Sequence, residues 1–162
     1  MKKTFVAILA VLTIASCNQD DTPVETTGSL SFVVSGSGPA RTDLAPDKLV
    51  ISVEDGQGKT IFDNKTFDLT QSDAGYATLP LPFDNGDYRI TKYLVISGTT
   101  AAYATPRSGS QKASLVDLPL PFDFTVVAGR ANTVIPKIVG ISSQDAPPSF
   151  GYGDFGYNTP RK

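Results

Sequence analysis

The chain contains no histidine and no tryptophan, and only one cysteine and one methionine among its 162 residues. Without histidine, the commonest general base is missing, as are the Ser-His and Cys-His nucleophile pairs and the usual zinc ligand. The single cysteine, Cys17, excludes a disulfide within the chain. The sequence therefore predicts no metal site and no cofactor, and it favours a protein that is not an enzyme.

Hydrolysis of glycosides by two carboxylates is the reaction that the composition leaves formally open. Seven acidic residues are available for it: Glu54, Asp55, Asp63, Asp68, Asp84, Asp87 and Asp123. Most of them fall at expected turns or strand ends, where aspartate is common because its side chain bonds the nearby backbone. The segment 84–87 also offers oxygen ligands that calcium accepts, but without the spacing and final glutamate of a calcium loop. We interpret these acids as turn residues.

The formal charge is −2, and it becomes −4 when residues 1–16, with Lys2 and Lys3 and no acid, are removed. Binding to nucleic acid requires clustered lysine and arginine to displace counterions from phosphates. The charge therefore argues against a nucleic-acid partner. It argues equally against a basic patch that would bind anionic lipid.

The start of the chain has the pattern of a bacterial lipoprotein signal peptide. Lys2 and Lys3 precede an apolar run from Phe5 to Ile14, and the run closes on Ile14, Ala15, Ser16 and Cys17. The run is short for a membrane span, and small residues before the cysteine suit a signal peptidase. We predict that residues 1–16 are removed and that Cys17 carries lipid, which would anchor the protein stably. The alternatives are an ordinary secretory signal and a buried amphipathic helix.

Residues 17–27 are polar and acidic, with almost nothing to bury. Such a segment cannot recover its ordering entropy through packing, so it predicts a flexible tether. Asp20 and Asp21 resemble the acidic signal that follows the lipidated cysteine in Bacteroidetes lipoproteins and directs them to the outer face of the outer membrane. A simple solvated linker is the alternative interpretation of these two residues.

From Gly28 onward, apolar and polar residues alternate with a period of two, which is typical of half-buried strands. The turn at 55–58 predicts a hairpin between 48–54 and 59–62. Further predicted strands span 30–34, 66–69, 76–81, 87–97, 101–105, 113–116, 122–127 and 132–139, and no segment keeps a helical period over three turns. Prolines in or beside these runs, such as Pro82 and Pro136, belong at sheet edges or bulges. The fold class is therefore all-β, a single antiparallel sandwich over residues 28–140.

Three segments give the chain a resemblance to a known module. They are residues 53–58, 75–79 and 85–90, in which glycine turns lead into strands with an aromatic and then an aliphatic residue. This pattern resembles the prealbumin-like, or carboxypeptidase-regulatory-like, β-sandwich. Residues 88–124 are similar to segments of Bacteroidetes surface lipoproteins. The resemblance implies a Greek-key sandwich at the cell surface, and it implies no catalytic residue.

Residues 141–162 are rich in proline, glycine and aromatic residues, and we expect this tail to be disordered or to begin a truncated second module. An alternative is that its aromatic residues dock on the sandwich or on a partner. Three tyrosines, Tyr76, Tyr93 and Tyr103, would stack on sugar rings if they were exposed. Buried strand tyrosines are the default interpretation.

Together these features predict a non-enzymatic outer-membrane lipoprotein, displayed at the cell surface. Its partners would be the membrane, through the lipid on Cys17, and another envelope protein that it binds or assembles with. One alternative is a glycan-binding accessory lipoprotein of polysaccharide uptake, which requires exposed aromatic residues on one sheet face. The other is a fimbrial or stalk subunit, which requires a free edge strand or a mobile terminal segment.

Overall fold

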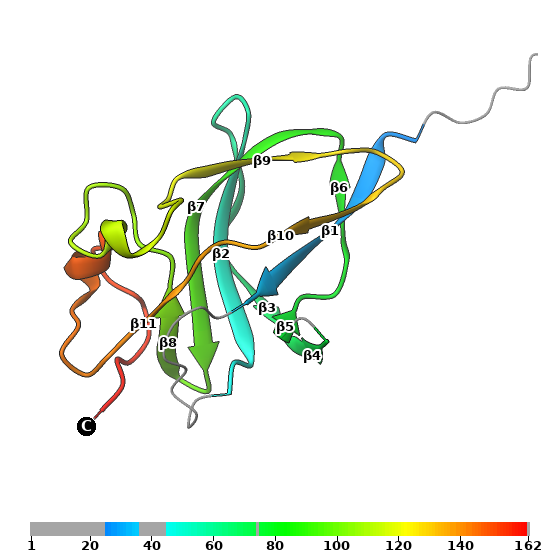
Figure 1. Cartoon of the computed structure of the whole chain (residues 1–162). Helices are drawn as coiled ribbons and strands as arrows, with labels where there is room; N and C mark the ends of the chain where they lie inside the picture. Colours follow the sequence, from blue (N-terminus) through cyan, green and yellow to red (C-terminus); the bar gives the residue numbers. More distant parts are fainter. Residues whose placement is uncertain (1–24, 36–44, 74, 162) are drawn as a thin grey trace, which may run out of the picture.

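The computed structural model describes residues 25–35, 45–73 and 75–161. The predicted signal peptide, the lipidation site at Cys17 and the acidic pair Asp20 and Asp21 lie outside the described residues. Within the described part, the chain is all-β with two packed sheets, which confirms the predicted fold class (Figure 1). No helix among the described residues has the length and apolar character needed to cross a membrane.

Sheet 1 has its strands in the order β10, β1, β5 and β4, and β6 pairs with the first half of β1. Their bounds are β1 Thr27–Val34, β4 Thr70–Ser72, β5 Gly75–Ala77, β6 Leu81–Asp84 and β10 Ala131–Val134. The pairing between β1 and β10 is parallel, whereas the other pairings are antiparallel. This is one departure from the expected antiparallel arrangement.

Sheet 2 has its strands in the order β11, β8, β7, β2 and β3, and β9 pairs with the first half of β7. Their bounds are β2 Lys48–Asp55, β3 Thr60–Asp68, β7 Gly86–Ser97, β8 Thr100–Ala104, β9 Phe122–Val126 and β11 Val139–Gly140. The twelve-residue β7 is the central strand, because it pairs with β2, β8 and β9.

The main core lies between the two sheets. Residues paired across antiparallel strands share a face, and one row of pairs joins Leu49 to Val95, Ile51 to Tyr93 and Val53 to Ile90. The Tyr93 hydroxyl donates a hydrogen bond of 3.2 Å to the carbonyl of Val33 in β1. This row therefore faces sheet 1, and all six side chains are fully buried.

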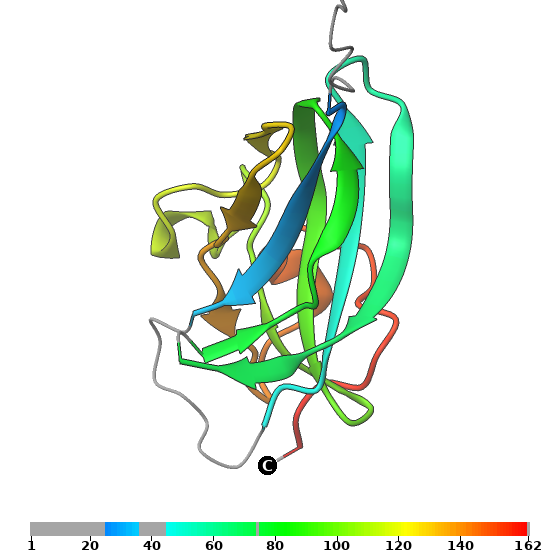
Figure 2. The ribbon, with the colours of Figure 1, turned by 90° about the vertical axis from the view of Figure 1, so that its right-hand side faces the viewer.

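The opposite row of sheet 2 forms its outer face, and it begins with Val50 paired to Leu94 and Ser52 paired to Lys92. Val50 and Leu94 are buried although no third sheet covers them. The C-terminal segment supplies the cover, because in Figure 2 it lies on the side of β2 and β7 opposite β1. The sandwich thus has a second core on its outer side.

The tail predicted to be disordered is part of this second core. Phe150 and Phe155 are fully buried, Tyr152 is nearly so, and their rings contact one another. The Tyr152 hydroxyl donates a hydrogen bond of 2.8 Å to the carbonyl of Thr105, at the end of β8. The expectation of disorder was wrong for residues 141–161, because three aromatic side chains bury enough apolar surface to fix a segment rich in glycine and proline.

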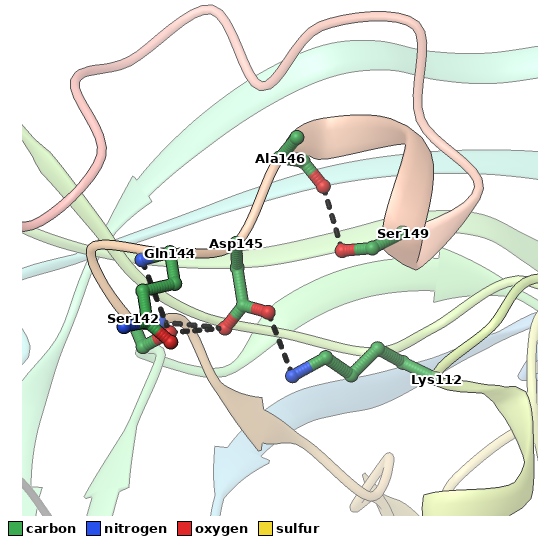
Figure 3. Close-up of polar contacts among 6 residues, drawn as sticks. All are labelled: Lys112, Ser142, Gln144, Asp145, Ala146 and Ser149. Atoms are coloured by element: carbon green, nitrogen blue, oxygen red, sulfur yellow. Dashed lines mark hydrogen bonds and ion pairs between the residues drawn. The ribbon is translucent and has the colours of Figure 1, made fainter.

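A polar lock holds the start of the tail (Figure 3). The Lys112 ammonium lies 2.7 Å from the Asp145 carboxylate, which also accepts hydrogen bonds from the backbone and hydroxyl of Ser142. The tail then forms a short 3₁₀ helix, η2 (Pro147–Phe150), which Gly151 ends in the left-handed conformation. A Cβ atom at Gly151 would lie 2.8 Å from the Cβ of Arg107, so the close approach also requires glycine.

Three local predictions differ from the structure. Residues 113–116 were expected to form a strand, but Ala113–Leu115 form a 3₁₀ helix, η1. The strand expected at 132–139 is broken between β10 and β11, where Pro136 has no N–H for a ladder. The strand expected at 76–81 is interrupted at 78–80, where Pro80 has no N–H for a ladder, and the chain resumes as β6.

Candidate interaction surfaces

The upper half of the outer face of sheet 2, where β7 pairs with β9, is not covered by the tail. It holds an acidic hollow of about 410 Å³, whose charged lining residues are Glu54, Asp55, Asp87, Arg89 and Asp123. Arg89 binds Asp123 through two hydrogen bonds of 2.6 and 3.1 Å, which lower the pKa of Asp123 and raise that of Arg89. The Thr125 hydroxyl donates to Asp87 at 2.7 Å. These groups therefore largely satisfy one another.

A second hollow of about 300 Å³, the junction hollow, lies where the tail meets the bare half of the face. Lys92 is part of its lining, and the Lys92 ammonium donates a hydrogen bond of 2.7 Å to the side-chain oxygen of Asn64. Burial lowers the pKa of Lys92, although the charges of Asp154 and Asp63 oppose the shift. Positive and negative groups are mixed here, so the hollow selects no ligand charge.

Strand β3 is a long edge strand. It spans nine residues and, among the described strands, pairs only with β2. One side of its backbone therefore offers unpaired N–H and C=O groups, which is how edge strands accept an added strand. A bulge interrupts the edge near Asn64, which has a positive φ of 49°, so the straight stretches lie on either side of it.

Strands β3 and β6 both lie on the side that faces the viewer in Figure 2. An aromatic hollow of about 280 Å³ lies between them. Its lining consists of Thr27, Ile61, Phe62, Pro82, Phe83, Asp84 and Tyr88. The ring of Phe83 contacts those of Phe62 and Tyr88 edge to face, at centroid distances of 5.5 and 5.2 Å. Ile61 keeps 38% of its surface exposed, so the apolar lining reaches the surface.

On the opposite side of the sandwich, the side chain of Asn132 connects the two sheets by hydrogen bonds. The two N–H groups of its side-chain amide are shared among the carbonyls of Ser29, Val127 and Arg130, and its oxygen accepts from the backbone N–H of Val127. These bonds join β10 to β1 and to the turn after β9. Of the two long sides of the sandwich, the β3–β6 side is therefore the open one.

The site residues predicted from the sequence separate into three groups, which are the lipidation residues, the tyrosines and the acidic residues. The lipidation residues Ile14, Ala15, Ser16 and Cys17, with Asp20 and Asp21, lie outside the described part of the chain. Of the tyrosines considered for sugar stacking, Tyr93 and Tyr103 are buried and Tyr76 is half-buried. The large apolar residues exposed in the described part are isoleucine, leucine and valine, and its phenylalanines and tyrosines are buried or half-buried, so none of them forms a fully exposed platform for a sugar.

Four of the seven candidate acids, Glu54, Asp55, Asp87 and Asp123, line the acidic hollow, and the other three lie outside it. Most of those that form hydrogen bonds have partners of their own. Asp87 bonds Thr125, Asp63 accepts a hydrogen bond from Ser52, and Asp55 accepts from the backbone of its own turn. Among the described residues, no three His, Cys, Asp or Glu side chains are grouped as metal ligands are. The segment 84–87 places its side chains on different partners, as expected for turn residues.

Sequence analysis missed the aromatic hollow and the free edge of β3. The prediction of a hairpin at 55–58 is confirmed, since β2 pairs with β3. Which edge of that hairpin stays free depends on the order of the remaining strands, which local patterns do not give. The segment 81–84 carried a partial signal, because its Leu-Pro-Phe-Asp sequence places a proline in a strand and so marks an edge.

Searches against protein-family models and against curated proteins found no match. Two solved structures have a similar fold. One is a leucine-rich repeat protein from Bacteroides thetaiotaomicron, with 18% identity and a TM-score of 0.50 over 72% of this chain. The other is a minor pilin of Streptococcus agalactiae, with 14% identity and a TM-score of 0.43 over 76% of this chain. The chain spans 13% of the first protein and 48% of the second, and the likeness concerns the fold alone.

Proposed function

We propose that this chain is a lipoprotein of the outer membrane, anchored through Cys17 and displayed at the cell surface, which binds another envelope protein. In this proposal the β-sandwich is a non-enzymatic binding or assembly module of the prealbumin-like type. The observation that carries this proposal is the free edge of β3, which is nine residues long and lies next to the aromatic hollow. Such an edge joins readily to an extended segment of a partner.

The anchor fits this arrangement. β1 begins at Thr27, ten residues after Cys17, and an extended chain covers at most about 3.5 Å per residue. The tether therefore holds the start of β1 within about 35 Å of the bilayer. Thr27 also lines the aromatic hollow, so the open side of the sandwich stays within reach of other membrane-attached proteins.

A structural subunit that adds strands between its own copies is a second candidate function, because the same free edge supports it. The glycan-binding alternative has less support, since every aromatic side chain in the described part of the chain is buried or half-buried. The two supported functions differ in their partner. One predicts a different protein at β3, and the other predicts a second copy.

Location is tested first, by protease treatment of intact cells that express the full-length protein and are fed radiolabelled palmitate. We expect a palmitate-labelled protein that is degraded without lysis. Absence of label would refute the lipid anchor, and degradation only after lysis would refute surface display.

Partner binding is tested in the same cells with a photo-crosslinking residue in place of Ile61 on β3, and separately in place of Ser114 in η1. We expect a defined adduct with another envelope protein from position 61 and none from position 114. An adduct with a second copy would favour the structural subunit. The absence of adducts from every tested position on the sandwich would refute the proposed function.

A further inference from the structure

We infer that the aromatic hollow between β3 and β6 binds a lysine or arginine side chain of an extended segment in the partner, whose backbone adds to the edge of β3. This inference rests on the proposed function and names the chemistry of the partner. It depends on three properties of the hollow: its aromatic lining, its single carboxylate and its place beside an unpaired strand edge.

The lining suits the stem and head of a long cationic side chain. Phe62, Phe83 and Tyr88 supply aromatic rings, and aromatic faces attract ammonium and guanidinium groups through the ring quadrupole. The volume of about 280 Å³ is slightly below the usual range of small-molecule sites, about 300–1,000 Å³. It has room for one long side chain, whose methylene groups would pack against Ile61 and Pro82.

The charge of the hollow specifies the sign of that side chain. Asp84 is the only charged residue in its lining, and it is exposed at the rim. Within the described part of the chain, no lysine or arginine lies within ion-pairing distance of Asp84. Burial raises the pKa of Tyr88, and the nearby charges of Asp84 and then Asp55 raise it further, so the carboxylate of Asp84 acts on the aromatic wall of the hollow. A cation complements this lining and an anion does not.

The neighbouring edge specifies the form of the partner. The stretch of β3 before the bulge begins at Thr60 and runs past Ile61 and Phe62, which line the hollow. A strand paired with this stretch alternates its side chains between two faces, so every second residue can point into the hollow. On the other side, Pro82 removes one N–H from the edge of β6, and β3 is therefore the edge that accepts the strand.

A peptide titration tests the inference on the purified full-length protein in detergent micelles. The probes are the pentapeptide Thr-Val-Lys-Val-Thr and the same peptide with norleucine, which keeps the methylene stem and lacks the ammonium, in place of lysine. NMR spectra of ¹⁵N-labelled protein report both folding and the position of binding. We expect chemical-shift changes at Ile61, Phe62 and Asp84. We also expect the protein to bind the lysine peptide at least about fivefold more tightly than the norleucine peptide.

Asp84→Asn should remove the preference for lysine and leave the spectrum otherwise folded. The matched control, Asp117→Asn, removes an exposed carboxylate in the loop before β9 and should keep the preference. The inference is overturned if the two peptides bind equally, if neither produces a saturable shift at β3, or if the preference survives Asp84→Asn.

The crosslinking experiment separates this inference from the proposed function. If position 61 captures a partner in wild-type cells and Asp84→Asn abolishes the adduct, both stand. If the adduct persists in Asp84→Asn cells, the partner is bound without the carboxylate and only the cationic inference falls. If no position on the sandwich captures a partner, the proposed function is refuted, and the inference that rests on it is refuted as well.

Discussion

The two halves of the outer face of sheet 2 are built from the same strands, β2 and β7, and yet they have opposite characters. The lower half is apolar and lies under the aromatic tail, whereas the upper half is polar and open to solvent. The lower half stabilises the fold, because its side chains are removed from water on both faces of the sheet. The upper half is free to vary without cost to the core.

The amino-acid sequence of β7 already contains this difference. From Asp87 to Thr91 apolar and polar residues alternate, as they do in a strand with one solvated face. From Tyr93 to Ile96 the run is continuously apolar, and these four residues are fully buried. A continuous run of this kind requires cover on both faces, which two sheets alone do not provide for sheet 2.

The largest expected effect comes from removing an aromatic ring that covers the lower half. Phe155→Ala should lower the free energy of unfolding by about 3–5 kcal/mol, because it deletes a fully buried ring from the second core. Urea unfolding followed by circular dichroism measures the change. A loss below about 1 kcal/mol would mean that the tail does not contribute to the core as the structure indicates.

A smaller effect is expected at the hydroxyl that attaches the tail to β8. Tyr152→Phe should cost about 1–2 kcal/mol, since the carbonyl of Thr105 would lose a buried hydrogen bond. Burial also raises the pKa of Tyr152 to about 12, so the hydroxyl stays protonated at neutral pH and remains a donor. The same unfolding assay applies, with Tyr157→Phe, at a half-buried tyrosine of the same tail, as the matched control.

The polar lock should make part of the stability of the tail depend on pH. Burial tends to raise the pKa of Asp145, but hydrogen bonds from Lys112 and Ser142 outweigh burial and lower it. A depressed pKa in the folded state gives stability that is present above the unfolded value of 3.8 and is lost as the pH falls through the folded value. Asp145→Asn should therefore cost about 1 kcal/mol or less at neutral pH. In urea titrations, its difference from wild type should shrink below about pH 4. A difference that does not depend on pH would contradict this account.

The smallest effect is expected on the bare half. Arg89→Ala and Asp123→Asn break an ion pair whose side chains are both largely exposed, and such pairs contribute little in water. Neither variant should move the unfolding midpoint measurably. If either variant destabilised the protein as much as Phe155→Ala does, the upper half would belong to the core and the comparison would fail.

The fold class and the central strands were predictable from local patterns. Strands β2 and β7 agree with the predictions to within a residue or two, because alternation and turn residues are local signals. The tail was not predictable in the same way. Phe150, Tyr152 and Phe155 follow no helical or strand period, so only the tertiary contacts reveal that they are buried.

The candidate interaction site divides similarly. The lipidation residues around Cys17 form a local motif and remain a prediction from the sequence. The aromatic hollow joins Ile61 in β3 to Phe83 in β6, which lie in different sheets, and its carboxylate comes from Asp84, the last residue of β6. Local patterns placed Ile61 in a strand and Asp84 among the acidic turn residues, and only the packing of the two sheets brings them together with Phe83.

The bond from Tyr152 to β8 also bears on how such a chain is made. Tyr152 contacts the backbone of Tyr93, 59 residues earlier, and covers an apolar face formed largely by strands that precede it. During synthesis the N-terminal strands emerge first, so that face stays exposed until residues 150–155 follow. We therefore expect the growing chain to need protection from aggregation until its last aromatic residues are made.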